Sequence, residues 1–157
     1  GITEELVKYP ADKYTGKPLI IQIFGSWCPN CKDEAEFYAD LYDQYHEEGL
    51  EIIGIGFERP EDLQGKKDRI KDFASSLNIP YEFCVGGSSS KDSANAAIPQ
   101  LEHVMSFPTS VFIDRKGTIR MIHTGFYGPG TGKYYHTYKE RINHFVKELI
   151  MEAEPEV

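Results

Sequence analysis

The stretch that most constrains this 157-residue sequence is 24–31, which reads FGSWCPNC and holds two cysteines separated by two residues. The apolar run 19–24 before it is typical of a buried strand, and the amphipathic segment that begins near Pro29 is typical of a helix. Cys28 and Cys31 are therefore expected where a strand passes into a helix. The first turn of a helix offers unpaired N–H groups and the positive end of the helix dipole, which stabilise a thiolate. We expect the pKa of Cys28 to lie below the ~8.5 of a free cysteine.

The spacing of the two cysteines favours redox chemistry. Cys31 follows Cys28 by three residues and shares its helical face, so a disulfide can close between them and reopen by thiol exchange. Two other interpretations stay open. A zinc site usually needs four Cys or His ligands, and the sequence has neither a second CxxC nor an HxxxH pair. A purely structural disulfide would close so short a loop that it adds little stability.

Length and charge limit the domain organisation of the chain and the classes of partner that it can bind. The chain fits one domain over residues 1–157, with a core at about 16–151. A net charge of −8 argues against a nucleic-acid partner, because such partners need a basic surface. The third cysteine, Cys84, falls within an apolar segment, where we expect structural burial. Because the sequence starts at Gly1 rather than Met, we expect a targeting segment or an upstream domain to have been removed.

The hydrophobic pattern predicts the element order β-α-β-α-β, followed by a β-hairpin and a closing helix. Strands are expected at 19–24, 50–57, 81–85, 109–113 and 118–124. Helices are expected from about 29 to 48, 61 to 77, 91 to 97 and 134 to 151, with a further short one at 3–9. The Gly- and Ser-rich run 86–90 is expected to be a flexible loop. Strands that alternate with helices form a parallel sheet with helices on both faces.

This combination resembles the thioredoxin superfamily, and within it the TlpA-like (ResA-like) branch of extracytoplasmic thiol–disulfide oxidoreductases. Four features carry the resemblance: Gly16-Lys17-Pro18 before the first strand, the WCxxC of 27–31, Phe107-Pro108-Thr109 followed by Val111-Phe112-Ile113-Asp114, and the extra helix 61–77 with strand 81–85. Together they span about residues 16–150. The resemblance implies a thioredoxin-like three-layer α/β/α fold, with a central five-stranded mixed sheet flanked by helices on both faces.

The resemblance also implies catalytic roles. Cys28 would be the exposed nucleophile that attacks a substrate disulfide, and Cys31 the buried thiol that resolves the mixed disulfide. Gln22 stands where thioredoxin has a buried acid, and it cannot ionise. TlpA-like members often supply an acid from the end of the next strand, where this sequence has Glu58. Burial would raise the pKa of Glu58 and suit it to exchange protons with Cys31, whereas the alternative is a solvated Glu58 paired with Arg59.

Four residues are implied to contact substrate: Trp27, Pro29, Phe107 and Pro108. Pro108 would follow a cis peptide bond and lie against the cysteine pair. The backbone of Phe107 would pair with the substrate chain like a short strand. The ring of Phe107 has an alternative role in core packing.

We therefore expect a protein disulfide oxidoreductase that needs no cofactor or metal. By family analogy it would act as a reductant on thiol- or disulfide-bearing proteins in the periplasm or another exported compartment. It would be a monomer that receives electrons from a membrane donor. The family's usual N-terminal hairpin is missing from the sequence, so we expect the C-terminal fragment of a longer exported protein that could be anchored through a removed N-terminal segment. One alternative is a copper chaperone of related fold, although those proteins use CxxxC with a downstream His. Another is a peroxiredoxin-type peroxidase, whose Pro and Thr before the reactive Cys are missing from Gly25-Ser26-Trp27.

Overall fold

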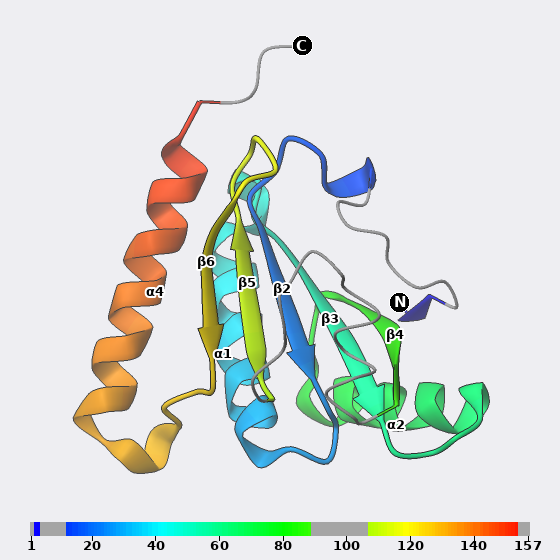
Figure 1. Ribbon diagram of the computed structural model, residues 1–157. Coiled ribbons are helices and arrows are strands. Elements are labelled where there is room, and N and C mark those ends of the chain that lie inside the picture. The colour runs from blue at the N-terminus through cyan, green and yellow to red at the C-terminus, as the bar shows by residue number, and fades with distance from the viewer. Residues whose placement is uncertain (1, 4–11, 89–106, 154–157) are drawn as a thin grey trace.

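The computed structural model describes residues 2–3, 12–88 and 107–153, which are built around a mixed β-sheet (Figure 1). Its spatial order is β1-β4-β3-β2-β5-β6. The first four strands run parallel, and β5 and β6 each pair antiparallel with their neighbour. The strands are β1 (Ile2–Thr3), β2 (Leu19–Phe24), β3 (Glu51–Glu58), β4 (Glu82–Ser88), β5 (Thr109–Ile113) and β6 (Ile119–Thr124). The predicted five-stranded mixed sheet is confirmed, and the two-residue β1 extends it at one edge.

Three α-helices accompany the sheet: α1 (Pro29–Tyr45), α2 (Leu63–Leu77) and α4 (Lys133–Met151). Single turns of 3₁₀ helix occur at η1 (Asp12–Tyr14), η2 (His46–Glu48) and η3 (Pro129–Thr131). Helix α2 begins later than the predicted residue 61 because Asp62 is its N-cap and accepts a 2.8 Å hydrogen bond from the Gly65 N–H. The helix expected at 91–97 lies outside the described residues, as does most of the one expected at 3–9, where Ile2–Thr3 form β1.

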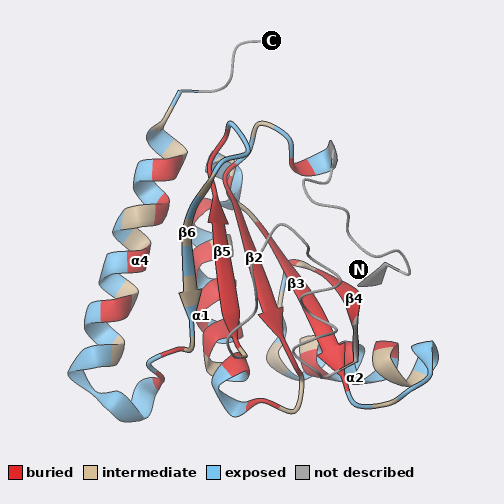
Figure 2. Cartoon of the chain, in the orientation of Figure 1, coloured by how far each residue is buried: buried red, intermediate tan, exposed pale blue. Residues whose placement is uncertain are grey.

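The two faces of the sheet bury two separate hydrophobic clusters, because successive side chains of a strand point to opposite faces. On β2, Ile20 and Phe24 join the cluster that also holds the buried side chains of α1, α2 and α4. Their neighbours Ile21 and Ile23 belong to the cluster on the other face, together with Cys84 of β4. The central strands are buried over nearly their whole length (Figure 2). Because β2 is buried along its whole length, the position of its carboxyl end, from which the chain enters the CxxC motif, is well defined.

Candidate active site

The CxxC motif lies at the start of α1, as the sequence predicts. Cys28 is the N-cap residue, with an extended backbone, and Pro29 occupies the first turn, where its missing N–H leaves no bond unmade. The Cys28 carbonyl accepts from the N–H of Cys31 at 3.1 Å and of Lys32 at 3.4 Å. Both cysteines are therefore held at the positive end of a 17-residue helix.

The two thiols have very different environments for ionisation. The Cys31 thiol donates a hydrogen bond to the Cys28 sulfur, and this interaction, with the backbone N–H groups of Cys31 and Asn30, outweighs burial and lowers the pKa of Cys28 to about 7. Burial raises the pKa of the Cys31 thiol far above its usual range, and the hydrogen bond to Cys28 raises it further. The predicted fall in the pKa of Cys28 is confirmed. Cys28 therefore ionises near neutral pH, while the Cys31 thiol stays protonated.

Cys28 is less exposed than a nucleophile at a helix start was expected to be. Only 7% of Cys28 is exposed, against 0% of Cys31. The Cys28 Sγ lies 3.8 Å from the carbonyl oxygen of Phe107, which belongs to the segment before β5. The Phe107-Pro108 peptide bond is cis, and this segment lies against the cysteine pair, so both parts of that prediction are confirmed.

Trp27 connects the motif to two other segments. Its indole N–H donates to the carbonyl of Phe57 at the end of β3, at 2.9 Å, and its ring meets that of Phe107 edge to face at 5.3 Å. The guanidinium of Arg59 lies 5.3 Å from the centre of the indole ring. Trp27 and Phe107 are only partly buried, so an aromatic surface borders the Cys28 sulfur.

Glu58 is buried, with 1% of its surface exposed, so the alternative of a solvated side chain is wrong. Burial raises the pKa of its carboxyl, although two hydrogen bonds from Ser26 act in the opposite direction. The Ser26 N–H donates to one oxygen at 2.8 Å, and the Ser26 hydroxyl donates to the other at 2.7 Å. These two hydrogen bonds connect the end of β3 to the loop that carries Cys28.

A second buried acid, Glu34, was missed by sequence reasoning. It lies one helical turn after Cys31 and has no exposed surface. Burial raises the pKa of its carboxyl to about 8. The Ser110 hydroxyl, which itself accepts from Tyr38 at 2.6 Å, donates to one Glu34 oxygen at 3.2 Å, while the other oxygen has no partner among the described residues. The charged form of Glu34 raises the pKa of Cys31, so the two groups interact electrostatically.

Gln22 of β2 supports Cys31 through the Cys31 backbone carbonyl. Its amide N–H donates to the Cys31 carbonyl at 3.2 Å, and its amide oxygen accepts from the Tyr81 hydroxyl at 2.8 Å. All three residues are buried. The residue that stands in the position of thioredoxin's acid therefore serves as a neutral hydrogen-bonding bridge, and the nearby ionisable group comes from α1 instead.

Parallel strands that end in a CxxC at a helix N-terminus, with a cis-proline segment beside it, define a thioredoxin-fold dithiol protein. The chain belongs to the AhpC/TSA family, whose sequence model matches residues 3–122. It is 25% identical over 112 residues to the thiol-disulfide oxidoreductase ResA of Geobacillus thermodenitrificans, an alignment that covers 71% of this chain and 57% of that protein. The chain thus spans little more than half of the length of this relative.

Solved structures share the fold. A thiol:disulfide interchange protein of the thioredoxin family from Chlorobium tepidum superposes with a TM-score of 0.66 at 18% identity, covering 88% of this chain and 83% of that one. A thiol-disulfide isomerase from Corynebacterium glutamicum gives 0.67 at 16% identity, with coverage of 94% and 90%. These likenesses confirm the thioredoxin-like architecture. Within the described residues, no helix is both long and apolar enough to cross a bilayer.

Proposed function

We propose that this protein is a thiol–disulfide oxidoreductase that exchanges disulfides with protein substrates through Cys28 and Cys31. The observation that carries the proposal is the separation of the two pKa values at the start of α1. One thiol ionises near neutral pH and its partner is held protonated. Since only the thiolate is nucleophilic, this arrangement makes Cys28 the attacking group and reserves Cys31 for the second step.

The proposed exchange transfers two electrons from the protein to the substrate in two steps. The Cys28 thiolate attacks one sulfur of a substrate disulfide, that S–S bond breaks, and the departing substrate thiolate takes up a proton. Cys31 then loses its proton and attacks the Cys28 sulfur of the mixed disulfide. The second substrate sulfur leaves as a thiolate and is protonated. The substrate has gained two electrons, and the protein holds a Cys28–Cys31 disulfide.

The second step needs a group that removes the proton from Cys31. Glu34 suits this role because it is buried one turn away, interacts with the Cys31 charge and has a pKa of about 8, close to neutral pH. Glu58 also has a raised pKa, and its proton exchange with Cys31 stays a prediction. The contacts of the Glu58 carboxylate with Ser26 favour a further role in holding the active-site loop.

A substrate chain is proposed to bind across the aromatic surface beside Cys28. Trp27 and Phe107 offer partly buried rings, and Pro29 is exposed next to the nucleophile. The backbone of Phe107 approaches the Cys28 sulfur, so a substrate strand paired with it, next to Pro108, would bring its disulfide to the thiolate.

We further propose that the protein acts as a reductant outside the cytoplasm, as a monomer supplied by a membrane electron donor. The support is the similarity to ResA together with the extra helix α2 and strand β4 that the TlpA-like resemblance implied. The same branch suggests a longer parent protein with an N-terminal anchor.

Equilibration with redox buffers tests this function directly. A potential near or below roughly −250 mV would support a reductant, whereas one near about −120 mV would make the protein an oxidant. Cys28→Ser should abolish turnover of a disulfide substrate, and Cys84→Ala, on the other face of the sheet, should retain it. Absence of exchange, with tight Cu(I) binding lost in Cys28→Ser or with turnover of hydrogen peroxide, would overturn the proposal in favour of a metal chaperone or a peroxidase.

A further inference from the structure

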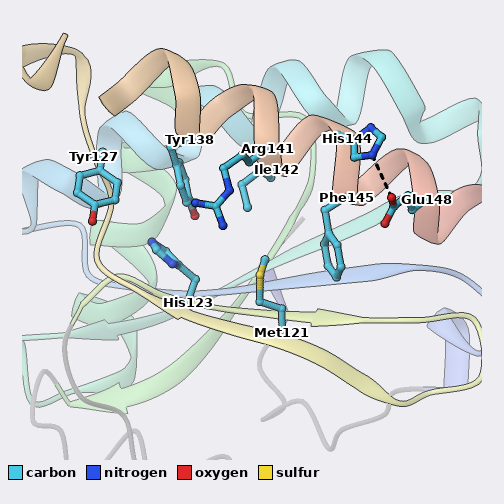
Figure 3. Close-up of a pocket in the computed structure, with 9 residues that line it drawn as sticks. All are labelled: Met121, His123, Tyr127, Tyr138, Arg141, Ile142, His144, Phe145 and Glu148. Atoms are coloured by element: carbon cyan, nitrogen blue, oxygen red, sulfur yellow. Dashed lines mark ion pairs between the residues drawn. The ribbon is translucent and has the colours of Figure 1, made fainter. Parts of the chain in front are cut away.

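A cavity of about 360 Å³ opens between β6 and α4, at the opposite edge of the sheet from β1 (Figure 3). None of the residues that line it belongs to the CxxC motif. Met121 and His123 of β6 face α4 across it but are only half-buried, so the two elements do not close fully on each other. Small-molecule sites occupy about 300–1,000 Å³, which places this cavity within the range for a compact ligand.

Most of the cavity wall is apolar or aromatic. Met121, Ile142 and Phe145 form one part of the lining, and Tyr127 and Tyr138 form another, with their rings edge to face at 5.9 Å. Aromatic rings and thioether sulfurs make favourable contacts with a further ring. The body of a ligand that fits this wall is therefore apolar and preferably cyclic.

The charged groups are separated along the cavity. At one end, Figure 3 shows the Arg141 guanidinium close to His123 and Tyr138. No carboxylate pairs with Arg141 within the part of the chain that the structure describes, whereas at the other end His144 and Glu148 form an ion pair at 3.0 Å. A single cation without a counter-charge favours a monoanion, and the far end, where His144 already contacts Glu148, offers no unpaired cation among the lining residues for a second negative group.

His123 also has an unsatisfied polar atom at the Arg141 end of the cavity. Its Nε2 is buried and makes no hydrogen bond to any described residue. Buried polar atoms in native proteins are nearly always paired, so this corner lacks a polar partner that a bound ligand can supply. Burial and the charge of Arg141 lower the pKa of His123, which is thus neutral at pH 7 and can donate or accept according to its tautomer.

We propose that the cavity between β6 and α4 binds a small aromatic monocarboxylate, with its carboxylate at Arg141 and His123 and its ring over Met121, Ile142 and Phe145. A carboxylate accepts charge-assisted hydrogen bonds from a guanidinium in the planar geometry that Arg favours. The site is independent of the dithiol, so it holds or fails separately from the proposed redox function.

Titration of the ¹⁵N-labelled protein with 2-naphthoate, followed by amide chemical shifts, tests the proposal. We expect saturable shifts centred on Met121, His123 and Phe145, with a Kd of about 1 mM or tighter. The neutral analogue 2-naphthalenemethanol should bind about tenfold more weakly, because it lacks the charge that Arg141 recognises. The Cys28→Ser variant should bind 2-naphthoate like the parent protein.

Two variants of exposed α4 residues separate a built site from general charge attraction. Arg141→Gln should weaken binding of 2-naphthoate about tenfold, whereas Lys147→Gln removes the same charge from the same helix outside the cavity and should change Kd by less than about twofold. The proposal is overturned by unsaturated or scattered shifts at about 10 mM ligand, or by equal affinities of the two variants.

Discussion

Ser26 and Glu58 form a two-point contact in which the N–H and the hydroxyl of Ser26 each donate to a different oxygen of the Glu58 carboxylate, at 2.8 and 2.7 Å. Ser26 lies two residues before Cys28, the first residue of the CxxC motif, and Glu58 ends β3. Because Trp27 also bonds to the β3 carbonyl of Phe57, two consecutive residues of the active-site loop are attached to the same strand end. The position of the Cys28 thiol thus depends on β3 as well as on α1.

Replacement of Glu58 by Gln tests this contact. An amide can accept from Ser26 with its oxygen, but its NH₂ group faces the second Ser26 donor, so we expect a loss of about 1–3 kcal/mol in the free energy of unfolding. Ser26→Ala removes only the hydroxyl donor and should cost less. Denaturant unfolding of both variants measures the difference.

The same Glu58→Gln variant decides whether Glu58 exchanges protons with Cys31. If it does, the pH dependence of the resolving step should be lost in Glu58→Gln. In Ser26→Ala its midpoint should move to higher pH, because this variant lacks a hydrogen bond that lowers the pKa of Glu58. A pH profile that is the same for both variants and the parent would contradict proton exchange and leave Glu58 as a positioning residue alone. Stopped-flow decay of a mixed disulfide at several pH values provides the measurement.

The Cys28 pKa should depend on the hydrogen bond from Cys31. This bond is the largest cause of the fall to about 7, so Cys31→Ala should raise the Cys28 pKa toward the ~8.5 of a free thiol. Cys31→Ser keeps an O–H donor and should raise it less. Thiolate absorbance or the rate of alkylation by iodoacetamide, followed against pH, reports the midpoint. Midpoints in both variants equal to that of the parent protein would show that the helix N–H groups alone set the pKa.

Glu34 should make the folded state less stable as the pH rises. Its pKa is about 8 in the folded protein, against about 4.3 in an unfolded chain, so the native state holds the proton more tightly. Its contribution to stability is fully present below about pH 4.3 and is lost as the pH rises through about 8, by up to about 5 kcal/mol. Glu34→Gln, which cannot ionise, should remove this loss.

Thermal unfolding between pH 4.5 and 8.5 checks the Glu34 prediction. Glu36→Gln is the matched control, because Glu36 lies on the same helix and is exposed. Its pH profile should follow that of the parent protein. A parent profile as flat as that of Glu34→Gln would mean that the Glu34 carboxyl is not destabilised by burial.

Local patterns explain why much of the site could be predicted from the sequence. The apolar run of β2 and the proline after Cys28 place the motif at a strand-to-helix junction without knowledge of distant residues. The cis bond before Pro108 and the position of Glu58 came from resemblance to a family, since a dipeptide or a single glutamate does not specify them.

Glu34 was missed because its burial depends on residues far along the chain. Helix α1 carries many acidic residues, and Glu34 looks like one more member of a solvated face. One signal was available: it shares the helical face of Cys31, Ala35 and Tyr38, all of which are buried. The polar partner that allows an acid there, Ser110 of β5, lies 76 residues away in sequence and meets α1 only in the folded sheet.

The Gly-rich composition of 86–90 predicts a flexible loop, but β4 continues through Gly86 to Ser88. Composition gives the wrong prediction here because glycine is common in loops, whereas Gly86 is needed for close packing within the sheet. A Cβ at Gly86 would lie 2.4 and 2.6 Å from ring atoms of Phe57 and 2.7 Å from a methyl of Ile55. The strand therefore needs a residue without a side chain at this point.

Gly86→Ala should accordingly destabilise the protein by about 1–3 kcal/mol, because the buried ring of Phe57 must move to admit the methyl group. Gly130→Ala is the control, since no atom lies within 4 Å of the added Cβ there. In the double variant Gly86→Ala/Phe57→Leu, the smaller side chain should relieve the clash. The loss in the free energy of unfolding should then be smaller than the sum of the losses in the two single variants. Strict additivity in denaturant unfolding would instead trace the loss to backbone conformation at Gly86.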